Sequence, residues 1–470
     1  MSPIPLSRAL MCLLLCLLQS TLLAQTLLDR SFGDAGLRAL NALGGFVEAM
    51  GSCPHADGSI SVVGYRAVNG TLVIARLTAA GELDTRFSED GVSEVSIFMP
   101  MAAERSATSC SGVGNSTPED DRVLVAASSP GSTYDTVVAA LLDLNTGLLD
   151  TGFYSGGIAI WDIGGLIVPP VNGVRAYPQT HVRGVFSGPS GGWLLVGQLA
   201  GHSSGIPRGM IARVNAIGSL DAYAAPNPSG FDPLELNAAR VGNDGHLRVL
   251  GSGVTTTGVS WGLLSLDPLT LAPTLLQTGS GDFFDFRIFK GRAIGGGLMV
   301  AAALKNDGSA FGSSPKMLIV RDSAVTELAL PAVPSLEGVA AGPSGLSGSA
   351  AATGAVNNRA VFGMGLQTPN NALAGYYVSV VKLGNGAGVP DQVDVSFGQQ
   401  GAASFRYRPT TSVCAPEQAP PQRFANLSSW GETTLMVGST VPDCGPAFES
   451  SILAVRLNTD GEHLHHNGFE

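Results

Sequence analysis

The sequence predicts an all-β protein, a seven-bladed β-propeller of four-stranded blades that is closed when the N-terminal strand pairs with the last blade. Three observations lead to this prediction. A turn pattern recurs along the chain, short apolar runs separated by Gly, Asp and Pro fill each interval, and the two chain ends supply complementary parts of one unit. Regular repetition is typical of propellers and solenoids, and radial repetition leaves few exposed sheet edges.

The recurring turn reads Asp-x-x-Phe-x-x-x-Gly, and each copy follows Leu or Val. Intact copies begin at Asp29, Asp84, Asp150 and Asp394, and a weaker one begins at Asp221. The interval before Asp394 has room for three units. An Arg seven positions before the corresponding Leu marks units even where the turn has changed, as at Arg76, Arg213 and Arg321. Seven units then fit between Leu28 and the C-terminus.

Each residue type in the turn has a structural use. An Asp side chain can accept hydrogen bonds from the backbone amides that follow it, Phe is a large apolar anchor, and the final Gly tolerates a positive φ. We therefore expect the four Asp residues to shape the turn rather than bind a ligand.

The chain ends predict how the ring closes. The last unit supplies three strands and then stops, whereas the segment after the first turn reads as a fourth strand with no preceding three. We expect residues 36–42 to pair with 452–458, which would cover two sheet edges. The alternative is an open β-solenoid, whose rungs are usually shorter and more uniform.

The N-terminus predicts export. Arg8 is the only charged residue before Asp29, and an apolar run from 9 to 23 ends in Ala24-Gln25. This is typical of a signal peptide and is too short to span a bilayer as a helix, although an uncleaved anchor is the alternative. We expect residues 1–24 to be removed and 25–470 to form one domain that is secreted, periplasmic or at the cell surface.

Charge excludes some partners. The chain has 26 Lys+Arg against 37 Asp+Glu, a net charge of −11, which is unfavourable for nucleic acid. No later segment predicts a membrane span. We expect a monomer without a cofactor or metal, since neither a P-loop nor a zinc-binding pattern is present and the histidines at 463, 465 and 466 belong to a solvated tail.

Four cysteines remain after the signal peptide, and an even number in an oxidising compartment predicts two disulfides. Cys414 and Cys444 fall in loops that leave one blade on the same side. Cys53 and Cys110 occupy matching positions in blades one and two. We expect Cys414–Cys444 and Cys53–Cys110.

No catalytic residues are predicted. A Gly-x-Ser-x-Gly pattern at 201–205 lacks the helix that a nucleophile elbow requires. Several arginines fall near the start of a blade's first strand, where they could bind an anion around the central channel. Alternatively, their stems pack between blades. The candidates are Arg105, Arg183, Arg240, Arg287 and Arg423.

A family resemblance rests on these motifs. Residues 28–33, Leu-Asp-Arg-Ser-Phe-Gly, and 75–84, which contain Ala-Arg-Leu and Gly-Glu-Leu-Asp, resemble the delta-60 repeat family. The resemblance covers essentially the whole mature chain. It implies an exported β-repeat protein and no catalytic residues.

The function predicted is that of an exported, non-enzymatic binding or scaffold propeller for a protein, a glycan or a small anion. The alternatives are a hydrolase or lyase with its site in the channel and a small-anion sensor that uses the arginines. Long loops on a rigid scaffold usually carry binding residues. We expect them on one face, together with the main pocket and Arg183, Arg287 and Arg423 at its floor. These loops are 164–180, 200–208, 306–315, 367–375, 409–422 and 441–450.

Overall fold

The computed structural model describes most of residues 28–458. Its longer gaps are 98–105, 112–121, 202–205, 280–285, 307–312, 336–340, 353–358, 368–372, 385–388, 407–421 and 441–450. The predicted signal peptide, Cys414, Cys444, Arg105 and the histidine tail lie outside the described residues. No helix in the described part is long and apolar enough to cross a membrane.

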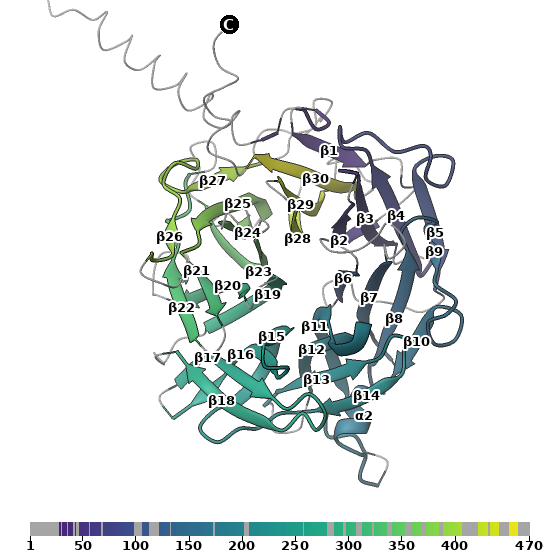
Figure 1. Ribbon diagram of the computed structural model, residues 1–470, viewed down its shortest axis with the longest axis vertical. Helices are drawn as coiled ribbons and strands as arrows, with labels where there is room; N and C mark the ends of the chain where they lie inside the picture. Colours follow the sequence, from purple (N-terminus) through teal and green to yellow (C-terminus); the bar gives the residue numbers. More distant parts are fainter. Residues whose placement is uncertain are drawn as a thin grey trace, which may run out of the picture.

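Seven four-stranded blades form a ring, which confirms the predicted fold class (Figure 1). Blade 1 contains β2 (Val47–Pro54), β3 (Ile60–Arg66), β4 (Thr71–Leu77) and β5 (Val92–Ser96). Blade 2 contains β6 (Ser106–Ser111), β7 (Arg122–Ser129), β8 (Thr136–Asp143) and β10 (Ile158–Trp161), with the short β9 (Leu148–Leu149) also on β8. Blade 3 contains β11 (Gln179–Ser187), β12 (Trp193–Ala200), β13 (Arg208–Val214) and β14 (Leu220–Ala224).

The second half of the ring repeats this order, and the first strand of each blade lies nearest the centre (Figure 1). Blade 4 contains β15 (Asp232–Val241), β16 (Leu247–Thr255), β17 (Gly258–Leu266) and β18 (Pro273–Thr278). Blade 5 contains β19 (Phe286–Ile294), β20 (Leu298–Asn306), β21 (Ser313–Arg321) and β22 (Ala324–Ala329). Blade 6 contains β23 (Gly342–Ala352), β24 (Arg359–Gln367) and β25 (Leu373–Lys382), and β26 (Gln392–Val393) and β27 (Ala402–Phe405) share the outer position.

Blade 7 joins the two ends of the chain. It contains β28 (Gln422–Trp430), β29 (Thr433–Thr440), β30 (Ser451–Asn458) and, as its outer strand, β1 (Leu37–Leu40). β1 pairs antiparallel with β30, with Leu37 opposite Val455 and Leu40 opposite Ile452. The segments expected to pair are therefore neighbours in one sheet, and the outer edge of β30 is covered.

The hydrophobic core is divided among the spaces between neighbouring blades. Side chains of a strand alternate between its two faces, so each blade contributes to the interface on either side. In blade 3, for example, Leu195 packs with residues of blade 2, whereas Leu194 packs with residues of blade 4. This arrangement explains why nearly every strand reads as an apolar run, since both of its faces are buried.

Strand direction defines two faces of the ring. We call one the turn face, because it carries the first-to-second connections and the Leu-Asp-x-x-Phe turns. The other, the long-loop face, carries the second-to-third and interblade connections. One first-to-second connection is longer than expected: β6 ends at Ser111 and β7 begins at Arg122, and the residues between them lie outside the described part.

A short helix, α2 (Ile163–Ile167), lies between blades 2 and 3, where only irregular chain was expected. Asp162 begins it, because its side chain accepts a hydrogen bond from the Gly165 N–H at 3.0 Å. A second short element, the 3₁₀ turn η3 (Pro189–Gly191), joins β11 to β12.

Candidate functional site

The Asp-x-x-Phe turns are the most regular polar feature of the ring, and they have the predicted geometry. In all four intact copies the Asp side chain accepts a hydrogen bond from the N–H two residues on, at 2.9–3.2 Å. The backbone N–H of each Phe also donates to the Asp carbonyl, at 2.9–3.0 Å. These carboxylates hold their own turn together, as an Asx turn requires.

The Phe and Gly of the turn also behave as predicted. The four phenylalanines are at most 5% exposed, and the N–H of each final Gly donates to the Phe carbonyl at 2.7–2.8 Å. The final glycines have φ between +86° and +97°, a region that other residues rarely adopt. They are Gly36, Gly91, Gly157 and Gly401.

Three of the four turn phenylalanines are also joints between blades. A Cβ on Gly81 of blade 1 would lie 2.9 Å from the ring of Phe32, and a Cβ on Gly147 of blade 2 would lie 2.6 Å from the ring of Phe87. Gly218 of blade 3 stands in the same relation to Phe153. The ring of one turn therefore sits on a glycine of the next blade, which explains the Gly that precedes Leu-Asp in the repeat.

A repeated ion pair completes the turn face. Every blade places a basic side chain near this end of its second or third strand, and each lies within 4 Å of an Asp carboxylate. The pairs are Arg76–Asp84, Arg122–Asp150, Arg213–Asp221, Arg248–Asp244, Arg321–Asp391, Arg359–Asp394 and Arg456–Asp29. We call this set the Arg–Asp ring.

Three arginines of the Arg–Asp ring also reach the next blade. Arg456 donates to the carbonyl of Ala79 at 2.5 Å, and Arg321 donates to that of Gly384 at 2.9 Å. Arg213 donates to a backbone carbonyl of blade 4 in the same way. A single guanidinium thus neutralises a carboxylate and fastens a neighbouring turn, as its several donors allow.

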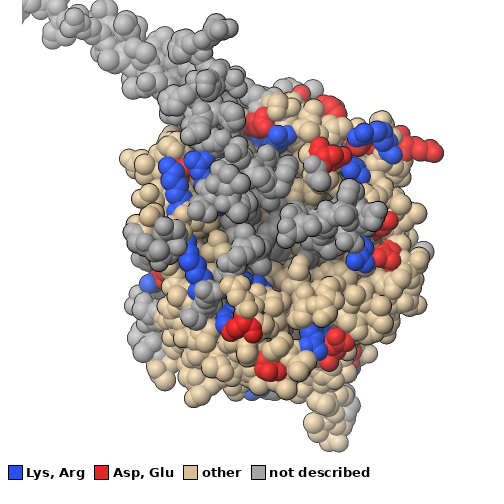
Figure 2. Space-filling view, in the orientation of Figure 1, with Lys and Arg blue, Asp and Glu red and all other residues tan. Residues whose placement is uncertain are grey.

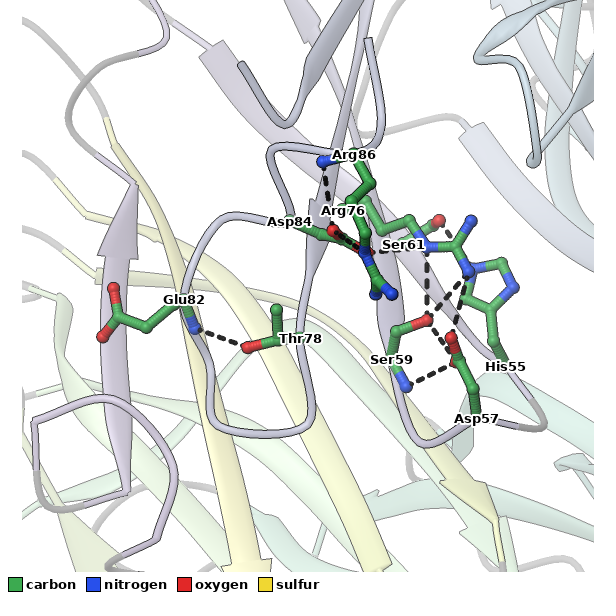
Figure 3. Close-up of polar contacts among 9 residues, drawn as sticks. All are labelled: His55, Asp57, Ser59, Ser61, Arg76, Thr78, Glu82, Asp84 and Arg86. Carbon is green, nitrogen blue, oxygen red and sulfur yellow. Dashed lines mark hydrogen bonds and ion pairs between the residues drawn. The ribbon is translucent and has the colours of Figure 1, made fainter. Parts of the chain in front are cut away.

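Figure 3 shows the most elaborate part of this ring, in blade 1. Arg76 donates to the hydroxyl of Ser59 at 3.0 Å and lies 3.8 Å from Asp84. The hydrogen bond from the Arg86 side chain to Asp84, helped by the Arg86 N–H and by the charges of both arginines, holds the pKa of Asp84 below its usual value despite burial. This carboxylate therefore remains ionised at neutral pH and is fixed by its partners.

A histidine and a serine meet beside this cluster. The His55 Nε2 lies 2.7 Å from the Ser61 hydroxyl (Figure 3). A Ser–His contact can mark a nucleophile and its base. Here, however, Ser61 is completely buried and His55 is 5% exposed, so the hydroxyl cannot be reached by a substrate.

Blade 4 contains an Arg–Ser pair like that of blade 1, but the Arg and the Ser have exchanged strands. In blade 1, Ser61 of the second strand stands opposite Arg76 of the third. In blade 4 the second strand carries Arg248, which donates to Ser265 on the third at 2.8 Å and to Asp244 at 2.6 Å. Sequence reasoning missed this pair because it searched for Arg only on the third strand.

Of the five predicted channel arginines, only Arg183 and Arg240 have described side chains. Arg183 is the extra residue of a β-bulge in β11 and forms an ion pair with Glu235 of β15. It therefore links the inner strands of blades 3 and 4. Arg240 is 3% exposed and donates to the Val241 carbonyl at 3.3 Å. Arg287 and Arg423 lie in β19 and β28, but their side chains are outside the described part.

Some of the cysteines in the predicted disulfides lie outside the described residues. Cys53 is buried and disulfide-bonded, and no other cysteine has a described side chain. One contact bears on its partner: a Cβ on Gly51 of β2 would lie 2.0 Å from the Thr108 hydroxyl of β6. Cys53 and Cys110 each follow this contact by two residues on the first strands of adjacent blades. This placement supports the pairing Cys53–Cys110, which remains a proposal.

No group of three or more His, Cys, Asp or Glu side chains suited to a metal ion occurs in the described part of the chain. The charged side chains that come together there are mainly those of the Arg–Asp ring. What this arrangement does chemically is hold turns and join blades.

Comparisons with known proteins agree with the fold. Residues 55–87 match the family model of DUF5122, a domain of unknown function described as a β-propeller. The matched segment includes all the residues drawn in Figure 3. No match was found among curated proteins.

Several solved structures are similar to the chain. A virginiamycin B lyase from Staphylococcus aureus is 12% identical, with a TM-score of 0.42, and the match covers 89% of this chain and 98% of that one. The polysaccharide lyase Uly1 is 8% identical over 89% of this chain and 91% of that one, with a TM-score of 0.39. An α-L-arabinofuranosidase of Fusarium graminearum is 11% identical over 92% and 97%, with a TM-score of 0.36. Similarity at this level says nothing about activity.

Proposed function

We propose that this chain is an exported, non-enzymatic binding or scaffold propeller of the delta-60 repeat kind, whose ligand docks on the long-loop face. The observation that carries the proposal is the Arg–Asp ring. Each of its carboxylates is held by an arginine, and three of the arginines also bind the backbone of the next blade. Groups fixed in this way build the ring and are poorly suited to act as acid or base.

The central channel supports the same proposal where it is described. Arg183, a candidate for binding a small anion, is paired with Glu235 of the neighbouring blade. A guanidinium that already has a carboxylate partner has little remaining charge to offer an anion. The structural role, in which arginine joins adjacent blades, is therefore the one we favour for Arg183.

The long-loop face differs from the turn face in its connections. Its interblade segments vary widely in length, from residues 41–46 to residues 162–178, whereas the four intact Asp-x-x-Phe turns of the turn face share one geometry. Variable loops on a rigid scaffold can acquire binding residues without disturbing the core. We therefore assign ligand binding to this face and expect a glycan or protein of the cell envelope.

The test separates binding from turnover. Purified residues 25–470 are run in affinity gels containing xylan, alginate or soluble peptidoglycan fragments, and the same mixtures are assayed for new reducing ends and unsaturated products. Retention without product supports the proposal, whereas product formation contradicts it. A variant with 201–207 replaced by Gly and Ser should lose retention, and the turn-face control Glu82→Gln should keep it.

A further inference from the structure

The weak copy of the turn pattern at Asp221 does not form the Asp-x-x-Phe turn. In blade 1, residues 84–91 separate Leu83 from the paired part of β5. In blade 3, only residues 221–222 separate Leu220 from the equivalent position of β14. The chain therefore enters the fourth strand of blade 3 directly, without the loop that carries a phenylalanine in blades 1, 2, 6 and 7.

Blade 4 carries a second change, at the position that would meet the missing phenylalanine. In blades 1, 2 and 3 this position is a glycine, two residues before the Leu of the repeat, and the phenylalanine of the preceding blade sits on it. Its counterpart in blade 4 is Leu271, two residues before Pro273, the first paired residue of β18. The N–H of Leu271 donates to the carbonyl four residues back at 2.9 Å, and that of Gly147 does the same at 2.8 Å.

Leu271 keeps the backbone conformation of the glycines whose place it takes. Its φ is +57°, whereas the three glycines have φ between +73° and +84°. Bulky side chains are rare in this region. The side chain of Leu271 is 1% exposed and belongs to an apolar cluster against which Ala222 and Ala224 of β14 pack. The leucine is therefore part of the core between blades and is not a surface substitution.

Arg213 shows that this connection of blade 4 faces blade 3. Its guanidinium donates to the carbonyl of Pro268, in the same connection as Leu271. At the joint between blades 7 and 1, Arg456 makes the same contact with the connection in which Gly81 receives the phenylalanine of the preceding turn. By this correspondence, the Cβ of Leu271 points toward the space that a turn phenylalanine of blade 3 would fill.

Two other joints that lack the phenylalanine are held by polar side chains. Between blades 4 and 5, the Gln277 side chain accepts a hydrogen bond from the Val325 N–H at 2.8 Å. Between blades 5 and 6, Arg321 donates to Asp391 at 2.7 Å. In contrast, most of the visible surface over blades 3 and 4, at the bottom of the view in Figure 2, is uncharged. Leu271 is the apolar counterpart of these contacts at the joint between blades 3 and 4.

We propose that blades 3 and 4 meet through a reversed joint, in which Leu271 of blade 4 fills the space that the phenylalanine of the preceding blade fills in other joints. The reversed joint accounts for both departures from the repeat. Without the phenylalanine, a glycine in blade 4 would leave a cavity in the core, and with the phenylalanine, the leucine would crowd it. Leu271 therefore selects the preceding blade: only a blade without the turn phenylalanine fits beside blade 4, which fixes the order of these two blades in the ring.

The first test is the sign of the stability change in Leu271→Gly, measured by urea unfolding. Glycine relieves the positive φ, which by itself raises the urea concentration at the midpoint, whereas loss of the buried side chain lowers it. We expect a lower midpoint, because the lost packing of a buried leucine outweighs the relieved strain. The matched control is Leu269→Gly in the same connection, which alters a side chain that is 73% exposed and should change the midpoint little. A midpoint of Leu271→Gly at or above that of the wild type would overturn the proposal.

The second test returns the phenylalanine to blade 3. Ala222 is replaced by the blade 1 segment 85–91, which restores the turn and keeps Tyr223 in register with β13. With Leu271 present, the new ring has no space, so this graft should lower the midpoint. The graft combined with Leu271→Gly should have a higher midpoint than either change alone, whereas the graft combined with Leu269→Gly should show no such rescue. A combined variant that is no more stable than the graft alone would refute the reversed joint.

Discussion

Removal of the Phe153 phenyl group should destabilise the folded propeller more than the position of this residue in a surface turn would suggest. Phe153 is 1% exposed and packs edge-on against Trp193 of blade 3, with ring centroids 5.6 Å apart, and against Trp161 of its own blade at 6.5 Å. Deletion of a buried phenylalanine side chain typically costs about 3–5 kcal/mol. Phe153→Leu keeps much of the volume but loses two aromatic pairs, which together are worth about 1–3 kcal/mol.

The assay is denaturant unfolding followed by fluorescence, since Trp161 and Trp193 are two of the four tryptophans of the chain. Phe153→Leu and Phe153→Ala should both shift the unfolding transition to a lower denaturant concentration. The shift should be larger for Phe153→Ala. The control is Val395→Ala, an exposed position where we expect a change within about 0.5 kcal/mol. If Phe153→Ala shifted the midpoint no more than this control does, the turn phenylalanine would not be an interblade joint.

Three further predictions concern the repeat turn and the expected disulfide between blades 1 and 2. Because the pKa of Asp84 is lowered in the folded protein, its contribution to stability is present above about pH 4 and is lost as the pH falls through the folded value. Asp84→Asn should therefore be less stable at pH 7 and should lose less stability on acidification, and an acid limb identical to that of the wild type would contradict this. Gly157→Ala should cost about 2–5 kcal/mol, because it combines positive φ with a close contact, whereas Gly156→Ala, with positive φ but no atom within 4 Å of the added carbon, should cost only about 1–2. Equal losses in the two variants would show that crowding is unimportant. Peptide mapping without reductant should recover Cys53 linked to Cys110, and recovery of Cys53 with another cysteine would rule out this pairing.

The repeated turn was predictable from sequence because its requirements are local. The turn needs an Asp that accepts a hydrogen bond from the N–H two residues on, a Phe that is buried and a Gly with positive φ. Each requirement selects one residue type at a fixed position, so the turn can be recognised in the sequence. The same reasoning predicted seven blades even where the turn is lost, as in blades 4 and 5. It also predicted which strands would meet at the ends of the chain, since unpaired edges are unfavourable.

The pairing of side chains between blades was decided only by the tertiary structure. Nothing local to Arg183 indicates Glu235, because the two meet only when the bulge in β11 faces the inner strand of the next blade. Likewise, Arg248 carries no motif, yet it occupies in blade 4 the role that Arg76 has in blade 1. The repeat pattern therefore determines the structure within each blade. The contacts between blades, such as those of Arg183 with Glu235 and Arg321 with Asp391, depend on residues far apart in sequence.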